Sequence, residues 1–190
     1  MRWLILYARS RHVAVSLPAA VLCAAVLPAL LRDNWSTHYA TLALAAAIAV
    51  AAVGLSGQDI DLDRTAGVPW PPRRLAHLLL IGVAAAGILL AAQGVIDVAA
   101  QATPAWTLRN TAGLLGLTGL AATLFGGQLG WTLPLAWPMV SLFAPATEPP
   151  ALGAVIAWLT TPAGTPTAWW TAGILFAAGT ATYAARGARR

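Results

Sequence analysis

Residues 75–96 read LAHLLLIGVAAAGILLAAQGVI, and this apolar run decides which class of fold the chain can adopt. The hydrocarbon core of a bilayer is about 30 Å thick, and a helix of roughly 20 apolar residues crosses it. Five further apolar runs of similar length flank this one. They are His12–Leu31, Thr37–Ser56, Asn110–Gly127, Leu129–Ala146 and Pro166–Ala185. The sequence therefore predicts an all-α integral membrane protein with six transmembrane helices.

The overall composition agrees with a membrane protein. Of the 190 residues, 59% are hydrophobic and 9% are charged, whereas about 25% of the residues of a soluble domain are charged. A soluble fold and a disordered chain are therefore excluded. Cys23 is the one cysteine, which excludes an intramolecular disulfide and a cysteine-based metal cluster. We expect a single transmembrane domain over residues 1–190.

The arginines predict the orientation of the chain in the cell membrane. Two of the eleven, Arg32 and Arg109, fall on one side of the predicted spans. The other nine fall on the opposite side: Arg2, Arg9, Arg11, Arg64, Arg73, Arg74, Arg186, Arg189 and Arg190. Positive residues concentrate on the cytoplasmic side, so both termini are predicted to be cytoplasmic. The arginines form short clusters beside apolar runs, a pattern unlike that of a nucleic-acid-binding face.

Two segments outside the spans have their own expected structures. Met1–Arg11 alternates apolar residues with arginines, so it is either an interfacial helix on the cytoplasmic leaflet or a simple topogenic tail. Ala151–Thr161 is apolar but too short to cross a bilayer. We expect residues 147–165 to form an extracytoplasmic re-entrant or interfacial segment, because unpaired backbone cannot face lipid.

The loop over residues 57–74 reads GQDIDLDRTAGVPWPPRR and holds half of the acidic residues of the chain. A calcium loop would need Gly where Arg64 stands and Glu where Trp70 stands, so that interpretation fails. Asp59, Asp61 and Asp63 also suit a magnesium-dependent intramembrane lipid enzyme that binds a diphosphate. Such enzymes need a second Asp-rich loop, and the sequence has none.

A third interpretation of this loop is a docking element for a cytoplasmic protein. Gln58–Ala66 is long enough for about two helical turns. Asp59 near the start and Arg64 near the end both suit the helix dipole, while Ile60 and Leu62 supply apolar anchors. A fourth interpretation, a solvated loop that only sets topology, stays open, although it leaves the three aspartates unexplained.

The chain resembles a known family at this loop. The residues that carry the likeness are Asp61-Leu62-Asp63-Arg64-Thr65-Ala66, Pro69-Trp70, Arg73 and His77-Leu78-Leu79. They are similar to the cytoplasmic loop of small actinobacterial membrane proteins related to ABC-2-type permeases. The resemblance implies six spans, cytoplasmic termini, an N-terminal interfacial helix, a coupling helix between spans two and three, and a re-entrant hairpin before span six.

The same resemblance implies a function and partners. An ABC-2-like permease pairs with a second permease chain and is driven by a separate ATPase subunit. This chain has no phosphate-binding loop and no lysine, so ATP and magnesium would be bound by the partner. The expected docking residues are Gln58, Asp59, Ile60, Asp61, Leu62, Asp63, Arg64, Arg73 and Arg74. The alternative is a non-transporting anchor or accessory subunit of a larger complex.

The predicted spans contain few polar residues. Gln93, Gln128, Trp131 and Trp137 are the candidates to line a substrate path, the tryptophans because they lie in a proline-containing span. No nucleophile–base pair is visible, so no catalytic residue is predicted. Asp97 and Arg109 are expected at the outer interface, where they can pair. Gly113, Gly116 and Gly119 recur at intervals of three, which allows a second helix to approach closely.

Overall fold

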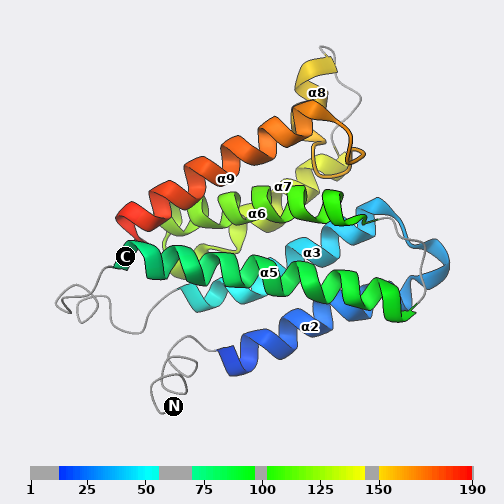
Figure 1. Ribbon diagram of the computed structural model, residues 1–190, viewed down its shortest axis with the longest axis horizontal. Coiled ribbons are helices and arrows are strands. Elements are labelled where there is room, and N and C mark those ends of the chain that lie inside the picture. Colours follow the sequence, from blue (N-terminus) through cyan, green and yellow to red (C-terminus); the bar gives the residue numbers. More distant parts are fainter. Residues whose placement is uncertain (1–12, 56–69, 97–101, 144–149, 190) are drawn as a thin grey trace.

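A computed structural model describes residues 13–55, 70–96, 102–143 and 150–189 (Figure 1). Within these residues, every regular element is a helix, which confirms the all-α prediction. The helices are α2 (Val13–Leu30), α3 (Thr37–Ala52), α5 (Trp70–Ile96), α6 (Pro104–Phe125), α7 (Thr132–Phe143), α8 (Pro150–Ile156) and α9 (Pro166–Arg186). Short 3₁₀ turns occupy Arg32–Asn34, Val53–Leu55 and Gly127–Leu129. Met1–Arg11 lies outside the described residues.

The prediction of six membrane spans is not supported by these helices. In the described part of the chain, only Pro71–Ile96 of α5 is both long enough and apolar enough to cross a bilayer, with a mean hydropathy of 2.4. The apolar stretches Pro18–Leu30 and Thr37–Ala52 are shorter, and α7 has 12 residues. Helices α6 and α9 have 22 and 21 residues, but polar residues within them lower their hydropathy.

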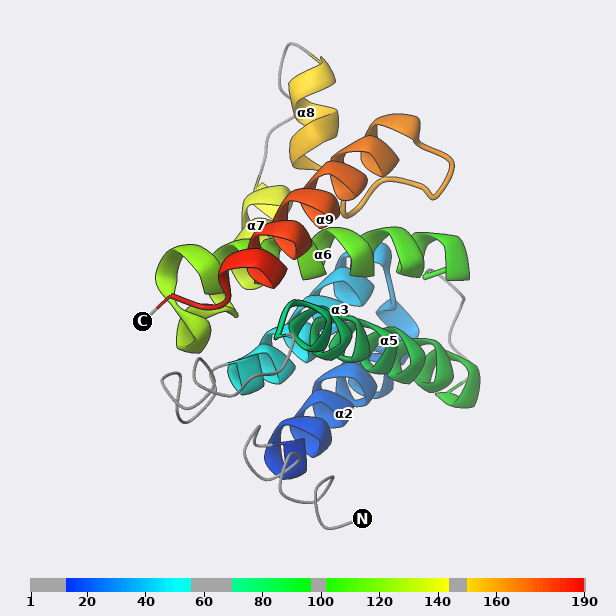
Figure 2. The same ribbon diagram turned by 60° about the vertical axis from the view of Figure 1, so that its left-hand side comes forward.

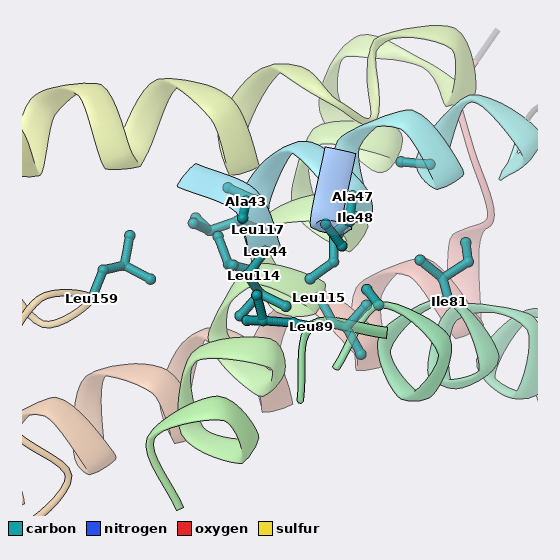
Figure 3. Close-up of a cluster of buried hydrophobic side chains, with 14 of the residues drawn as sticks. Ala43, Leu44, Ala47, Ile48, Ile81, Leu89, Leu114, Leu115, Leu117 and Leu159 are labelled. Carbon is teal, nitrogen blue, oxygen red and sulfur yellow. The ribbon is translucent and has the colours of Figure 1, made fainter. Parts of the chain in front are cut away.

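The described helices pack into one bundle in which α3 and α6 are the most buried and α5 contacts four other helices. Helix α5 packs against α2, α3, α6 and α9, and α2 also packs along α3. Figures 1 and 2 show α5 lying between α2 and the pair formed by α6 and α9. The largest buried cluster joins α3, α5 and α6 through Leu44, Ile48, Leu89 and Leu114 (Figure 3). The alanines of α3 let these helices come close together.

Helices α6 and α9 make the tightest contact in the bundle, and glycines permit it. A Cβ atom added to Gly119 would lie 2.5 Å from the carbonyl oxygen of Gly179. A Cβ atom at Gly116 would collide with the backbone at Leu175, and one at Gly179 would collide with Gly116. The predicted close approach at Gly116 and Gly119 is therefore confirmed, and the partner helix is α9.

The bundle has an apolar surface and several polar side chains in its interior. Leu80, Val83 and Val95 of α5 are 62, 71 and 85% exposed. In contrast, Arg109 and Asn110 of α6 are completely buried. A protein in water normally places large apolar groups inside and charged groups outside. The distribution in this bundle is the reverse at these positions.

We expect replacement of Gly179 by alanine to destabilise the bundle. The new methyl group would force α6 and α9 apart, and overpacking of this kind costs about 1–3 kcal/mol. Thermal unfolding of the detergent-purified protein measures the change. The matched control is Gly173→Ala in the same helix, where a Cβ atom meets nothing within 4 Å. Equal melting temperatures for the two variants would contradict the packing described above.

Candidate functional site

A short non-helical segment, residues 157–165, connects α8 to α9 and enters the bundle. Its side chains Trp158 and Leu159 are completely buried. Gly113 of α6 leaves room for Trp158, since a Cβ atom at Gly113 would lie 2.7 Å from Cζ3 of the indole ring. Trp158 and Leu159 therefore join the core of the bundle, while the later part of the segment is half-buried or exposed. We call residues 157–165 the connecting segment.

Arg109 and Asn110 of α6 bind the backbone of the connecting segment. The guanidinium of Arg109 donates from Nη1 to the carbonyl oxygen of Pro162 and from Nη2 to that of Thr161, both at 2.8 Å. Its Nε donates to Oδ1 of Asn110 at 3.0 Å. Asn110 in turn donates from Nδ2 to the carbonyl oxygen of Leu159 at 2.6 Å. These hydrogen bonds satisfy backbone carbonyl groups that have no hydrogen-bond partner within a helix.

Further side chains hold the start of the segment. Trp137 and Ser141 of α7 both donate to the carbonyl oxygen of Ile156, the last residue of α8. The hydroxyl group of Thr41 in α3 donates to the carbonyl oxygen of Thr37 at 2.8 Å and lies 3.4 Å from that of Leu159. Three helices distant in sequence therefore meet at the backbone of residues 156–162. We call Thr41, Arg109, Asn110, Trp137 and Ser141 the polar clasp.

The sequence predicted the segment that the polar clasp holds, but not the residues that hold it. The predicted re-entrant segment, residues 147–165, includes the connecting segment, but residues 144–149 lie outside the described part of the chain. Arg109 was expected at the outer interface near Asp97, which also lies outside that part. The structure instead buries Arg109 and directs it to the carbonyl groups. The one sequence signal for this role is an arginine followed by an asparagine at the edge of an apolar run.

Gln93 forms a second group of buried polar contacts at the end of α5. Its Oε1 accepts hydrogen bonds from Nε1 of Trp35 at 3.1 Å and from the backbone N–H of Ala102 at 3.3 Å. Its Nε2 donates to the carbonyl oxygen of Ala102 at 3.4 Å. Gln93 therefore ties the end of α5 to the start of α3 and to the residues that precede α6.

The four residues predicted to line a substrate path are not brought together. Gln93 lies near the start of α6 and Gln128 follows its end, and a helix of this length measures about 30 Å. Gln128 and Trp131 are exposed, whereas Trp137 belongs to the polar clasp. A path through these four residues stays a prediction.

The predicted docking residues are divided between described and undescribed parts of the chain. Gln58–Arg64 lies outside the described residues, whereas Arg73 and Arg74 stand in the first turns of α5. Arg74 donates from Nη1 to the carbonyl oxygen of Ala184 at 3.4 Å, near the end of α9. Its guanidinium also lies against Gly187, whose φ of 74° suits glycine.

The chain beyond α9 joins the same end of the bundle to α6. The backbone N–H of Arg189 donates to the carbonyl oxygen of Ala122 at 3.0 Å, and its Nη1 donates to that of Leu124 at 3.4 Å. The start of α5 and the ends of α6 and α9 are therefore joined through Arg74 and Arg189. Cations suit this position because the carbonyl ends of helices carry partial negative charge.

Comparisons with known proteins do not assign the chain to a group. No family model, no curated protein and no solved structure matches it. The functional assignment must therefore come from the residues and their geometry.

We expect Arg109→Met to destabilise the protein. The substitution keeps an unbranched side chain but removes both guanidinium donors. The carbonyl oxygen of Pro162 keeps the backbone N–H of Thr165, whereas that of Thr161 loses its donor, which costs about 1 kcal/mol. Thermal unfolding in detergent measures the loss. Arg32→Met is the control, because Arg32 is exposed. If the two variants melted alike, the clasp would have no energetic role.

Proposed function

We propose that the chain is a membrane permease subunit of an ABC-2-like exporter. Two permease chains would pair in the cell membrane, and a separate ATPase subunit would dock on Gln58–Arg74 from the cytoplasm. Both termini would then be cytoplasmic, as the arginine distribution indicates. In this proposal the chain binds no nucleotide itself.

The observation that carries the proposal is the reversed distribution of polarity. Large apolar side chains lie on the outside of α5, while Arg109, Asn110 and Gln93 are buried and donate hydrogen bonds to backbone carbonyl oxygens. In lipid, an exposed leucine has no cost and a buried polar group must find a partner within the protein. A membrane therefore suits this surface better than water does.

The connecting segment supports the same assignment. Irregular backbone at the depth of a bilayer is tolerated where protein buries it and satisfies its carbonyl groups. The polar clasp does this for residues 156–162, immediately before the last helix. A re-entrant hairpin before the last span is also what the family resemblance implies.

The contacts of Arg74 suggest how a docked ATPase would act on the bundle. The proposed docking residues lead directly into α5, whose Arg74 contacts the end of α9. Arg189 continues this link to the end of α6. A force applied to the loop before α5 would therefore reach three helix ends at once.

The proposal is tested with a reconstituted complex. The tagged chain is purified from its native membranes in mild detergent, any ATPase subunit that co-purifies is isolated, and the ATP hydrolysis of that subunit is measured with and without the chain. We expect the chain to bind the ATPase and to stimulate hydrolysis. Reversing two charges, with Asp63→Arg and Arg64→Asp together, should abolish both effects while the protein still inserts into membranes.

The control is Arg32→Asp, which changes a charge in the 3₁₀ turn between α2 and α3. It should leave ATPase binding and stimulation at the level of the unmodified chain. A chain that never binds an ATPase would refute the exporter assignment. Unchanged stimulation after the double reversal would refute the assigned docking loop.

A second function, a non-transporting anchor or accessory subunit, is favoured by one observation. The amide of Gln93 and the donors of the polar clasp are engaged in structural hydrogen bonds. An anchor needs such rigidity and no substrate path. It would co-purify with a larger complex without stimulating ATP hydrolysis, so the same experiment separates the two functions.

A further inference from the structure

The threonines in the described helices differ in what their hydroxyl groups bind. Six donate to the carbonyl oxygen four residues earlier, at 2.6 to 3.1 Å: Thr41, Thr118, Thr123, Thr171, Thr180 and Thr182. Thr107 and Thr111 of α6 differ. Their hydroxyl groups are buried and have no hydrogen-bond partner among the described residues. The same backbone acceptor is within reach of a threonine in a helix, so these two depart from the pattern of their own bundle.

Both threonines lie where α6 meets α5. The side chain of Thr111 packs on Gly82, since a Cβ atom at Gly82 would lie 3.0 Å from its Cγ2. Thr107 lies one turn earlier on the same face of α6. We call Gly82, Thr107 and Thr111 the α5–α6 seam. Each unpartnered buried hydroxyl group destabilises the closed seam.

The α5–α6 seam lies next to the apolar outside of the bundle. Val83, which follows Gly82, is 71% exposed, and Leu108, which follows Thr107, is 64% exposed. Leu108 is adjacent to Thr107 and stands three residues before Thr111 in α6, so an exposed apolar side chain lies beside the position of each unpartnered hydroxyl group. A molecule entering sideways between the helices would meet apolar side chains first and hydroxyl groups second.

We propose that α5 and α6 part at this seam and take up the polar head group of an amphipathic, lipid-like molecule. Its apolar part stays against Val83 and Leu108, while its head group binds the hydroxyl groups of Thr107 and Thr111. A head group that hydrogen-bonds with both hydroxyl groups satisfies two buried polar groups, which offsets part of the free-energy cost of opening. This inference rests on the proposed function, because it names the substrate class of the exporter and the route that the substrate takes. The route differs from the path predicted from the sequence, which is lined by Gln93, Gln128, Trp131 and Trp137.

Thiol labelling tests the opening. In a Cys23→Ala background, Thr107→Cys, Thr111→Cys and Thr118→Cys are each treated in detergent with a small negatively charged methanethiosulfonate. Thr118 is the matched control because it is fully buried in the same helix and its hydroxyl is bonded. We expect the first two variants to react about tenfold faster than the third, since local opening exposes them selectively. Equal rates would overturn the proposal.

A lysophospholipid tests the occupant. Lysophosphatidylcholine should slow the labelling of Thr107→Cys and Thr111→Cys, and its binding should weaken in the Thr107→Val/Thr111→Val variant but not in Thr118→Val. Valine keeps the shape of threonine, so folding is preserved while the hydroxyl is lost. Absence of protection, or equal binding by all variants, would overturn the assigned ligand.

The two proposals fail in distinguishable ways. Labelling and lysophospholipid binding need no ATPase, so they can succeed while the chain fails to stimulate ATP hydrolysis. That result would refute the exporter and keep the lipid-binding seam. Stimulated hydrolysis without labelling or protection would keep the exporter and refute the seam.

Discussion

The paired hydrogen bonds from Arg109 to the carbonyl groups of Thr161 and Pro162 are the constraint on which the arrangement of the last helix depends. The connecting segment has no helical ladder to satisfy its backbone, so it can be buried only where side-chain donors meet it. Arg109 and Asn110 supply these donors from adjacent positions of one helix. Because the connecting segment is held against α6, the start of α9 has a fixed position. Helix α9 then runs alongside α6.

The contact between α6 and α9 follows from this start. The two helices run in the same direction, with Gly116 against Leu175 and Gly119 against Gly179. Because their backbones touch, neither helix can slide or rotate without a clash. At the far end Arg74 and Arg189 join them to each other and to α5. One end of the pair is fixed by the polar clasp, and the other is fixed by arginines at helix ends.

The sequence predicted the elements better than the contacts between them. Apolar runs located the helices, and the glycines of α6 indicated a close helix partner, because both signals are local. The six predicted spans are not supported in the described residues, since several of the apolar helices are short and Arg109, Asn110 and the threonines of α6 reduce the hydropathy of that helix. The role of Arg109 could not be predicted, because its acceptors lie about fifty residues later and become neighbours only in the fold. The unpartnered state of Thr107 depends on a side-chain rotamer, which a sequence pattern does not specify.

The glycine contact also has a consequence for how the chain is made. Proteins emerge from the ribosome with the N-terminal part first, so α6 and the connecting segment exist before α9 has been synthesised. Until then the backbone at Gly116 and Gly119 faces no partner, and Arg74 and Ala122 lack the contacts that residues 184–189 provide. Helix α9 therefore completes its contact with α6 only after α6 and the connecting segment have been synthesised.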